Sequence, residues 1–170
     1  MSNSNNYKNP YYDPTKPTPN LMSKHSLPSA FLWGCAAGAI GVGIMTFGEK
    51  LEQAFTGRPN SYVPAHTLSN LLRLPPKPDS ERLWLNHVMH YGQGALAGGI
   101  RGIMSAYGVV GFFADFMFTG VRLAIDQTLE NVTEVGAPPW TWPLNEQIID
   151  VFHKAVYAFA TGYFADKFLH

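Results

Sequence analysis

Charged residues are scarce in this chain: Asp, Glu, Lys and Arg make up 14% of its 170 residues, against roughly 25% in soluble domains. Neither sign is in excess, because 12 basic and 12 acidic residues cancel. The chain therefore lacks the net positive charge that nucleic-acid-binding proteins present. Cys35 is the single cysteine, which excludes an intramolecular disulfide. No phosphate-binding glycine loop, nucleophile elbow or cysteine-pair motif occurs, and we expect no nucleic-acid partner and no cofactor.

Aliphatic residues are almost missing from residues 1–27, which consist largely of Asn, Ser, Pro, Tyr and Lys. Such a composition predicts a disordered polar tail. The tail contains no arginine, unlike a transit peptide, and it is too long and polar for the start of a simple cleaved signal peptide. The remaining residues, 28–170, suit one domain by their length.

The segment from Ala30 to Gly48 contains no charged residue. Its length meets the criterion of about 18 apolar residues for a membrane span, and we predict a helix over residues 30–56. Within it, Gly34-x-x-x-Gly38 matches the small-x-x-x-small pattern of close helix contact in lipid. The glycines that predict a packing face are Gly34, Gly38, Gly41 and Gly48. The alternative, a buried glycine-rich helix or strand in a soluble protein, is disfavoured because glycine weakens a water-exposed helix by about 1 kcal/mol per site.

Three further helices are predicted over residues 82–106, 112–131 and 145–169, separated by a tight turn and a proline-rich loop, and a second proline-rich loop precedes the first of them. A helix as long as 82–106 reaches across a bilayer core of about 30 Å. The predicted fold class is therefore all-α: a polytopic membrane protein with a four-helix transmembrane bundle. Four spans put both termini on one side of the bilayer. We expect that side to be cytoplasmic, which leaves the glycosylation sequon at Asn131 outside.

The two halves of this domain resemble each other. The run FGEKL from residue 47 is echoed by TGVRL from residue 119, and a loop with a Gly-x-Pro triplet follows each. A histidine, two alanines and a glycine then recur with the same spacing, beginning at His90 and at His153. These matches suggest two tandem two-helix repeats related in parallel.

Ionisable side chains recur on one face of each later helix. A charge at the bilayer centre costs about 2.5–3.5 kcal/mol on insertion scales, so these side chains should face the bundle interior. Arg101 and Asp115 fall toward the terminal side, where they could pair. The other group converges beneath the two proline-rich loops, in a predicted polar, water-accessible cavity: His87, His90, Arg122, Asp126, Asp150, His153 and Tyr157.

This polar group has two interpretations. Arg122–Asp126 and Asp150–Lys154 are each four residues apart, which favours structural ion pairs within a helix. For the three histidines a functional and a structural role are equally open. Histidine changes its charge in mild acid, so histidines grouped with carboxylates would respond to pH. A metal site built from the histidines fits no known ligand spacing, and we expect no metal.

Several short motifs together carry a resemblance to a known family. They are a glycine-rich first helix, a histidine-led second helix with Tyr91-Gly92, a third helix entered through Gly111, the loop Gly136-Ala137-Pro138-Pro139, and His153 with Tyr157. This arrangement is similar to that of the YagU-like small inner-membrane proteins, over about residues 30–168. The resemblance implies a four-helix membrane protein with a link to acid resistance. It offers no catalytic residues.

Three functional hypotheses follow. The first is a small transport or pH-responsive membrane protein whose functional site is the polar cavity. The second is a non-catalytic membrane scaffold or assembly factor, in which the glycine face of residues 30–56 packs on a partner. The third, a membrane-bound metal enzyme, has the least support. In each case we expect a lipid bilayer as the surroundings, with a second copy or another membrane protein as partner, and no organelle is indicated.

Overall fold

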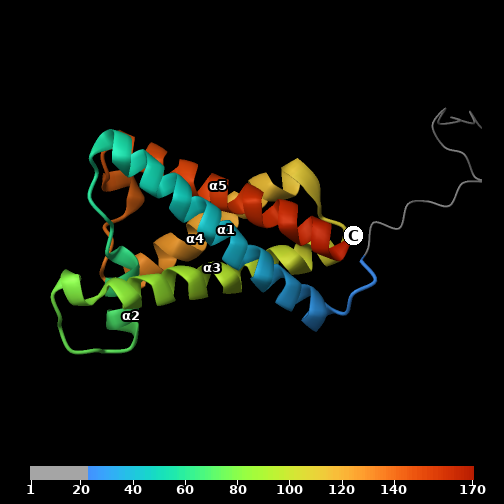
Figure 1. The fold of residues 1–170 in the computed structure, drawn as a ribbon, viewed down its shortest axis with the longest axis horizontal. Helices are drawn as coiled ribbons and strands as arrows, with labels where there is room; N and C mark the ends of the chain where they lie inside the picture. The colour runs from blue at the N-terminus through green and yellow to red at the C-terminus, as the bar shows by residue number, and fades with distance from the viewer. Residues whose placement is uncertain (1–22) are drawn as a thin grey trace, which may run out of the picture.

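The computed structural model describes residues 23–170, and these form an all-α fold with no strand (Figure 1). The helices are α1 (Leu27–Thr56), α2 (Val63–Leu71), α3 (Leu83–Ala106), α4 (Gly111–Val132) and α5 (Leu144–Leu169), with the short 3-10 helices η1 (Asp79–Glu81) and η2 (Pro139–Thr141) between them. The all-α prediction is confirmed, and the four long helices begin and end within three residues of the expected positions. The predicted tail lies outside the described residues as far as residue 22, and Leu27 already begins α1.

Consecutive long helices run in opposite directions along the bundle (Figure 1). α1 packs against α3 and α5, and α5 also packs against α4. The two described termini meet at what we call the terminal end, where the Ser23 N–H donates to the carbonyl of Ala106 (3.1 Å) and its hydroxyl to that of Leu169 (2.9 Å). The loops 57–82 and 133–143 lie together at the opposite, loop end.

α2 corrects the prediction of four helices to five. The four predicted helices did not include this segment, and its nine residues are too few to form a stable helix alone. Tertiary contacts hold it instead: it packs along α3, and the side chain of Asn86 accepts from the Ala65 N–H (3.0 Å) and donates to the Ser61 carbonyl (3.2 Å). The second half of the chain has no counterpart of α2, and the tandem repeat stays a prediction.

Glycines bring the backbones of α1 and α3 into contact. A Cβ added to Gly38 would lie 2.5 Å from the carbonyl oxygen of Gly94, and one added to Gly98 would lie 2.5 Å from the Cα of Gly38. Real Cβ atoms essentially never come so close, so only glycine fits at these positions. Gly34 faces Gly98 and Gly102 in the same way, and Gly41 faces Thr161 of α5. Gly48 differs from the expectation, because nothing lies within 4 Å of its side-chain position and it packs no helix.

This bundle buries charged side chains and exposes large apolar ones, the reverse of the usual distribution in soluble proteins. The largest fully buried side chains are Arg101 and Arg122, at 0% and 1% exposure. Large apolar side chains lie outside: Phe47 is 73% exposed, and Phe112 and Phe116 are 76% and 66% exposed. Buried charges are ordinarily rare in proteins, whereas an exposed large apolar surface marks an interaction with a partner or a membrane.

Only one of the described helices, α1, combines the length and the apolar composition of a membrane span, and it lies near the N-terminus, where a signal sequence would pass the same test. α3, α4 and α5 are long enough, but each carries ionisable residues that lower its hydropathy. The prediction of four spans therefore stays a prediction, with one apolar helix as its direct compositional support.

Candidate functional site

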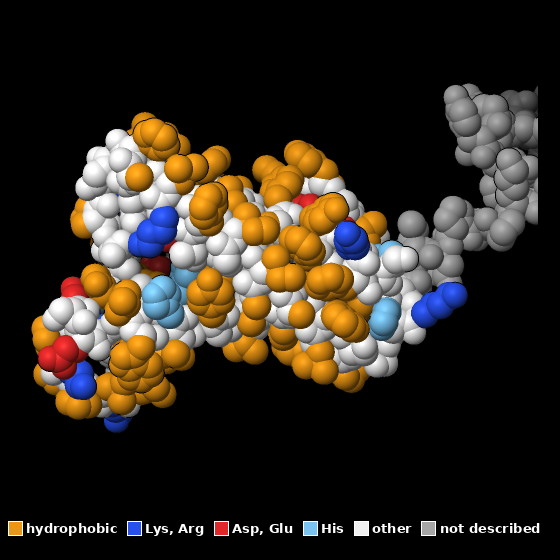
Figure 2. Space-filling model, in the orientation of Figure 1, with side chains coloured by type: hydrophobic (Ala, Val, Ile, Leu, Met, Phe, Trp, Pro, Cys, Tyr) orange, Lys and Arg blue, Asp and Glu red, His pale blue; other side chains and the backbone are white. Residues whose placement is uncertain are grey.

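A polar cavity of about 800 Å³ lies at the loop end of the bundle. Figure 2 shows the hollow between two lobes of the surface, with histidine and acidic side chains at its mouth. Its walls come from all five α-helices and from both loops. Six of the residues expected to meet here line it: His87, His90, Arg122, Asp126, Asp150 and His153. The seventh, Tyr157, lies deeper and does not line the cavity.

Asp126 is the centre of the cavity floor. Its Oδ1 lies 2.8 Å from Arg122 Nη1 and its Oδ2 lies 2.8 Å from Lys154 Nζ, so one carboxylate joins a cation of α4 to a cation of α5. Asp150 Oδ1 adds a second acid 3.3 Å from Lys154. Gln93 of α3 also donates to Asp126 Oδ1, at 2.5 Å. With two cations against two acids the cluster is neutral, the condition under which buried charges can persist.

The sequence indicated only part of this network. Both pairs within a helix, Arg122–Asp126 and Asp150–Lys154, could be found from their four-residue spacing. The bond between Asp126 and Lys154 joins α4 to α5, and no local pattern encodes which side chains meet across two helices. Gln93 was missed for the same reason.

Two histidines present unsatisfied ring nitrogens at the cavity. Nε2 of His90 and of His153 is buried and has no hydrogen-bond partner among residues 23–170. Buried polar atoms without protein partners ordinarily bind water or a ligand. His87 lies at the exposed rim. Nowhere in the described part of the chain do three or more His, Cys, Asp or Glu side chains gather closely enough to hold a metal ion.

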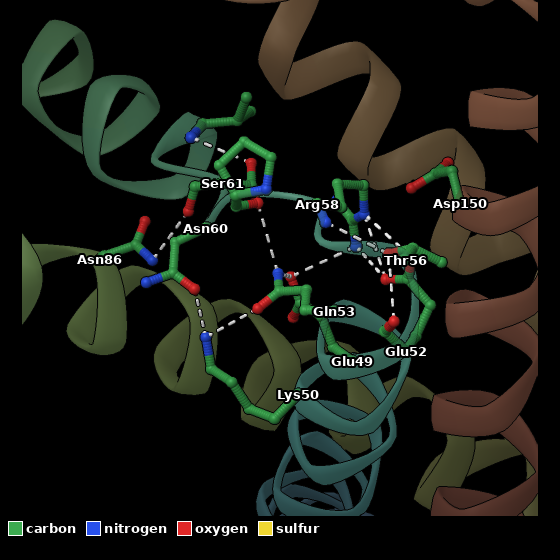
Figure 3. Close-up of polar contacts among 12 residues, drawn as sticks. Glu49, Lys50, Glu52, Gln53, Thr56, Arg58, Asn60, Ser61, Asn86 and Asp150 are labelled. Carbon is green, nitrogen blue, oxygen red and sulfur yellow. Dashed lines mark hydrogen bonds and ion pairs between the residues drawn. The ribbon is translucent and has the colours of Figure 1, made fainter.

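The rim of the cavity is fixed by contacts between the end of α1 and the loop that follows it (Figure 3). Arg58 Nη2 lies 2.8 Å from Glu52 Oε2 and 3.8 Å from Glu49 Oε1. The hydrogen bond to Glu52, with the negative charge of both carboxylates, raises the pKa of Arg58 above its ordinary value. Lys50 Nζ adds a 2.5 Å hydrogen bond to Asn60. The cavity predicted from the sequence did not include Arg58.

Tyr157 closes the cavity from below. Its hydroxyl donates to the carbonyl of Gly94 at 2.6 Å, and the guanidinium carbon of Arg122 lies 5.0 Å from the centre of its ring. Beneath it, Val42 and Phe118 belong to a fully buried apolar cluster. An apolar layer therefore separates the cavity from the terminal end.

A second charged cluster lies beyond that layer. Arg101 Nη2 is 2.8 Å from Asp115 Oδ1, and its Nη1 is 2.9 Å from Asp166 Oδ1. Asp166 also accepts from the N–H of Gly111 at the start of α4 (2.9 Å). The expected pairing of Arg101 with Asp115 is present, while Asp166 was missed because it comes from α5. This cluster ties α3, α4 and α5 together at the terminal end.

Replacing Tyr157 by phenylalanine is expected to lower the free energy of unfolding by about 1 kcal/mol, because the change removes a buried hydrogen bond to the Gly94 carbonyl and keeps the ring. Denaturant titration followed by circular dichroism measures the difference. Tyr163→Phe is the matched control, since that side chain is 61% exposed. Equal stability of the two variants would contradict a structural role for the hydroxyl.

The chain matches no protein-family profile, no curated protein and no solved structure. The resemblance to the YagU-like proteins is therefore an expectation from short motifs alone. Any function has to be argued from the cavity and from the surface around it.

Proposed function

We propose that this chain is an integral membrane protein whose four long helices span a bilayer, and that its polar cavity serves a small transport or pH-responsive function. The cavity would bind a small polar solute or exchange protons with the aqueous phase. The observation that carries the proposal is the inverted burial: charged clusters inside the bundle and large apolar side chains on its outside.

Lipid as the surrounding solvent accounts for this inversion. In a bilayer, ionisable side chains turn toward the bundle interior and find partners, as Arg101 does with two aspartates and Arg122 with Asp126. α4 carries four charged residues, and α3 carries Arg101 together with two histidines, so neither is as uniformly apolar as α1. The glycine contact of α1 with α3 fits as well, because helices in lipid associate through small residues rather than through hydrophobic burial.

The cavity supports a role beyond structure. A purely structural ion cluster would have its polar atoms satisfied within the protein, whereas Nε2 of His90 and of His153 lacks a partner among the described residues. A volume of about 800 Å³ also falls in the range of roughly 300–1,000 Å³ that ligand sites occupy. Histidine is suited to proton exchange near neutral pH, which is consistent with the acid-resistance link that the YagU-like resemblance implies.

The scaffold hypothesis has less support from the contacts of α1. Its glycines Gly34 and Gly38 already pack against α3, and Gly41 packs against α5, so they are not free for a partner protein. A scaffold would have to use the outer apolar surface, which in our proposal faces lipid.

Proton flux tests the proposal. The protein is reconstituted into vesicles that hold a pH-sensitive dye, and the internal pH is followed after an external acid step. We expect faster acidification than in empty vesicles, and we expect His90→Ala combined with His153→Ala to reduce the added rate at least tenfold, because these rings carry the unsatisfied nitrogens of the cavity.

His25→Ala is the control, since this exposed histidine lies at the terminal end, far along the chain from the cavity residues. Extraction of isolated membranes with alkaline carbonate is run on every variant to test integration. Release of the full chain into the supernatant would contradict the membrane assignment. Retention in the membrane with a flux that is indifferent to both cavity histidines would contradict the proton role.

A further inference from the structure

A second hollow adjoins the polar cavity, and it is almost entirely apolar. It encloses about 460 Å³ and opens between α3 and α4, which follow each other in the chain but contact each other little. We call it the apolar groove. Leu68 and Leu71 of α2 line it together with side chains of the two long helices, chiefly Val88, Leu96, Ile100 and Ile125.

The groove and the cavity share part of their lining. Gln93 of α3 and Leu129 of α4 border both of them. The hydrogen bond from Gln93 to Asp126 stands at this border and joins α3 to α4. A ligand that lies across the border would therefore have a polar part among the ionisable side chains and an apolar part between α3 and α4.

We propose that the groove and the cavity together bind one membrane phospholipid with a zwitterionic headgroup, its acyl chain in the groove and its headgroup in the cavity. This rests on the proposed function, because it requires the helices to lie in a bilayer. The groove's apolar wall suits a hydrocarbon chain, which gains affinity with each methylene that it buries.

Charge complementarity selects the headgroup. The cavity is lined by four cations, Lys50, Arg58, Arg122 and Lys154, and by five acids, Glu49, Asp126, Glu130, Glu146 and Asp150. A phosphate next to an amine offers an opposite charge to both sets, while a purely anionic headgroup would meet the acids without compensation. Polar atoms without a partner among the described residues are ready to receive it: His90 Nε2, Thr46 Oγ1 and Thr67 Oγ1.

Gly92→Leu tests the groove. Gly92 lines it, and nothing lies within 4 Å of its side-chain position, so leucine fills the groove without disturbing the packing of α3. Gly120→Leu is the matched control, because Gly120 is exposed on α4 with equal space around it and borders neither hollow. The purified, lipid-depleted chain is titrated with phosphatidylethanolamine or phosphatidylglycerol, and bound lipid is counted by native mass spectrometry.

We expect one phosphatidylethanolamine per chain in the unmodified protein and in Gly120→Leu, with about tenfold weaker binding in Gly92→Leu, since excluding even two methylene groups removes that much affinity. Equal lipid binding by the two leucine variants would overturn the proposal that the acyl chain lies in the groove. If phosphatidylglycerol bound as tightly as phosphatidylethanolamine, or more tightly, the proposed preference for a zwitterionic headgroup would be overturned. The flux and carbonate measurements on the same variants report separately on the proposed function. That function stands if the protein stays in the membrane and still conducts protons, even where Gly92→Leu and Gly120→Leu bind lipid equally.

Discussion

Replacing Gly98 by leucine is expected to lower the free energy of unfolding by about 3 kcal/mol or more. A Cβ at Gly98 would lie 2.5 Å from the Cα of Gly38 and 2.8 Å from its nitrogen. These are backbone atoms, which cannot rotate away, so α1 and α3 would have to separate. Separating the two helices would also break the neighbouring backbone contact between Gly34 and Gly102. Thermal unfolding in detergent, followed by circular dichroism, measures the loss.

Gly120→Leu again serves as the control, since it adds the same side chain to a helix position with open space around it. That variant should be as stable as the unmodified chain, or more stable by up to about 1 kcal/mol from its better helix propensity. A Gly98→Leu variant that unfolds at the control's temperature would show that the two helices do not pack as closely as described.

Replacing Arg101 by methionine is expected to cost about 3–5 kcal/mol of stability. Its guanidinium is fully buried and pairs with Asp115 and Asp166. Without it, two carboxylates from α4 and α5 would remain close together with no compensating cation. Lys77→Met is the control, because Lys77 pairs with Glu81 at 3.8 Å with both side chains more than half exposed, and such surface pairs contribute about 0–1 kcal/mol.

A triple variant separates the loss of charge balance from the loss of packing. Arg101→Met combined with Asp115→Asn and Asp166→Asn removes all three charges and keeps similar volumes. Neutral replacements of a buried ion cluster are often tolerated, so we expect the triple variant to recover most of the stability that the single variant loses. A triple variant less stable than Arg101→Met would show that the charges themselves hold α3, α4 and α5 together.

Local sequence patterns were sufficient for the long helices. Apolar segments of spanning length, together with the glycine and proline interruptions between them, placed the four long helices to within three residues. The spacing of Gly34 and Gly38 indicated a close helix contact, and the four-residue spacing of Arg122 and Asp126 indicated a pair within α4. All of these signals depend on residues within one or two helical turns, where geometry is fixed by the backbone.

Contacts between distant segments were beyond such patterns. α2 is too short to be stable alone and forms because it packs on α3. Asp166 joins Arg101 across 65 residues of sequence, and Lys154 joins Asp126 across two helices. The apolar groove lies between α3 and α4, consecutive helices that contact each other little and that both pack against α5.

The sequence by itself determined the all-α character, the positions of the long helices and the presence of ionisable residues along their faces, because each follows from composition and from helical periodicity. Only the tertiary structure decided which of those residues meet, that Tyr157 lies beneath the cavity and outside its lining, and that Gly48 packs against nothing. The physical reason is that a helix fixes the direction of its side chains but not the neighbour they face, which depends on how all the helices pack at once.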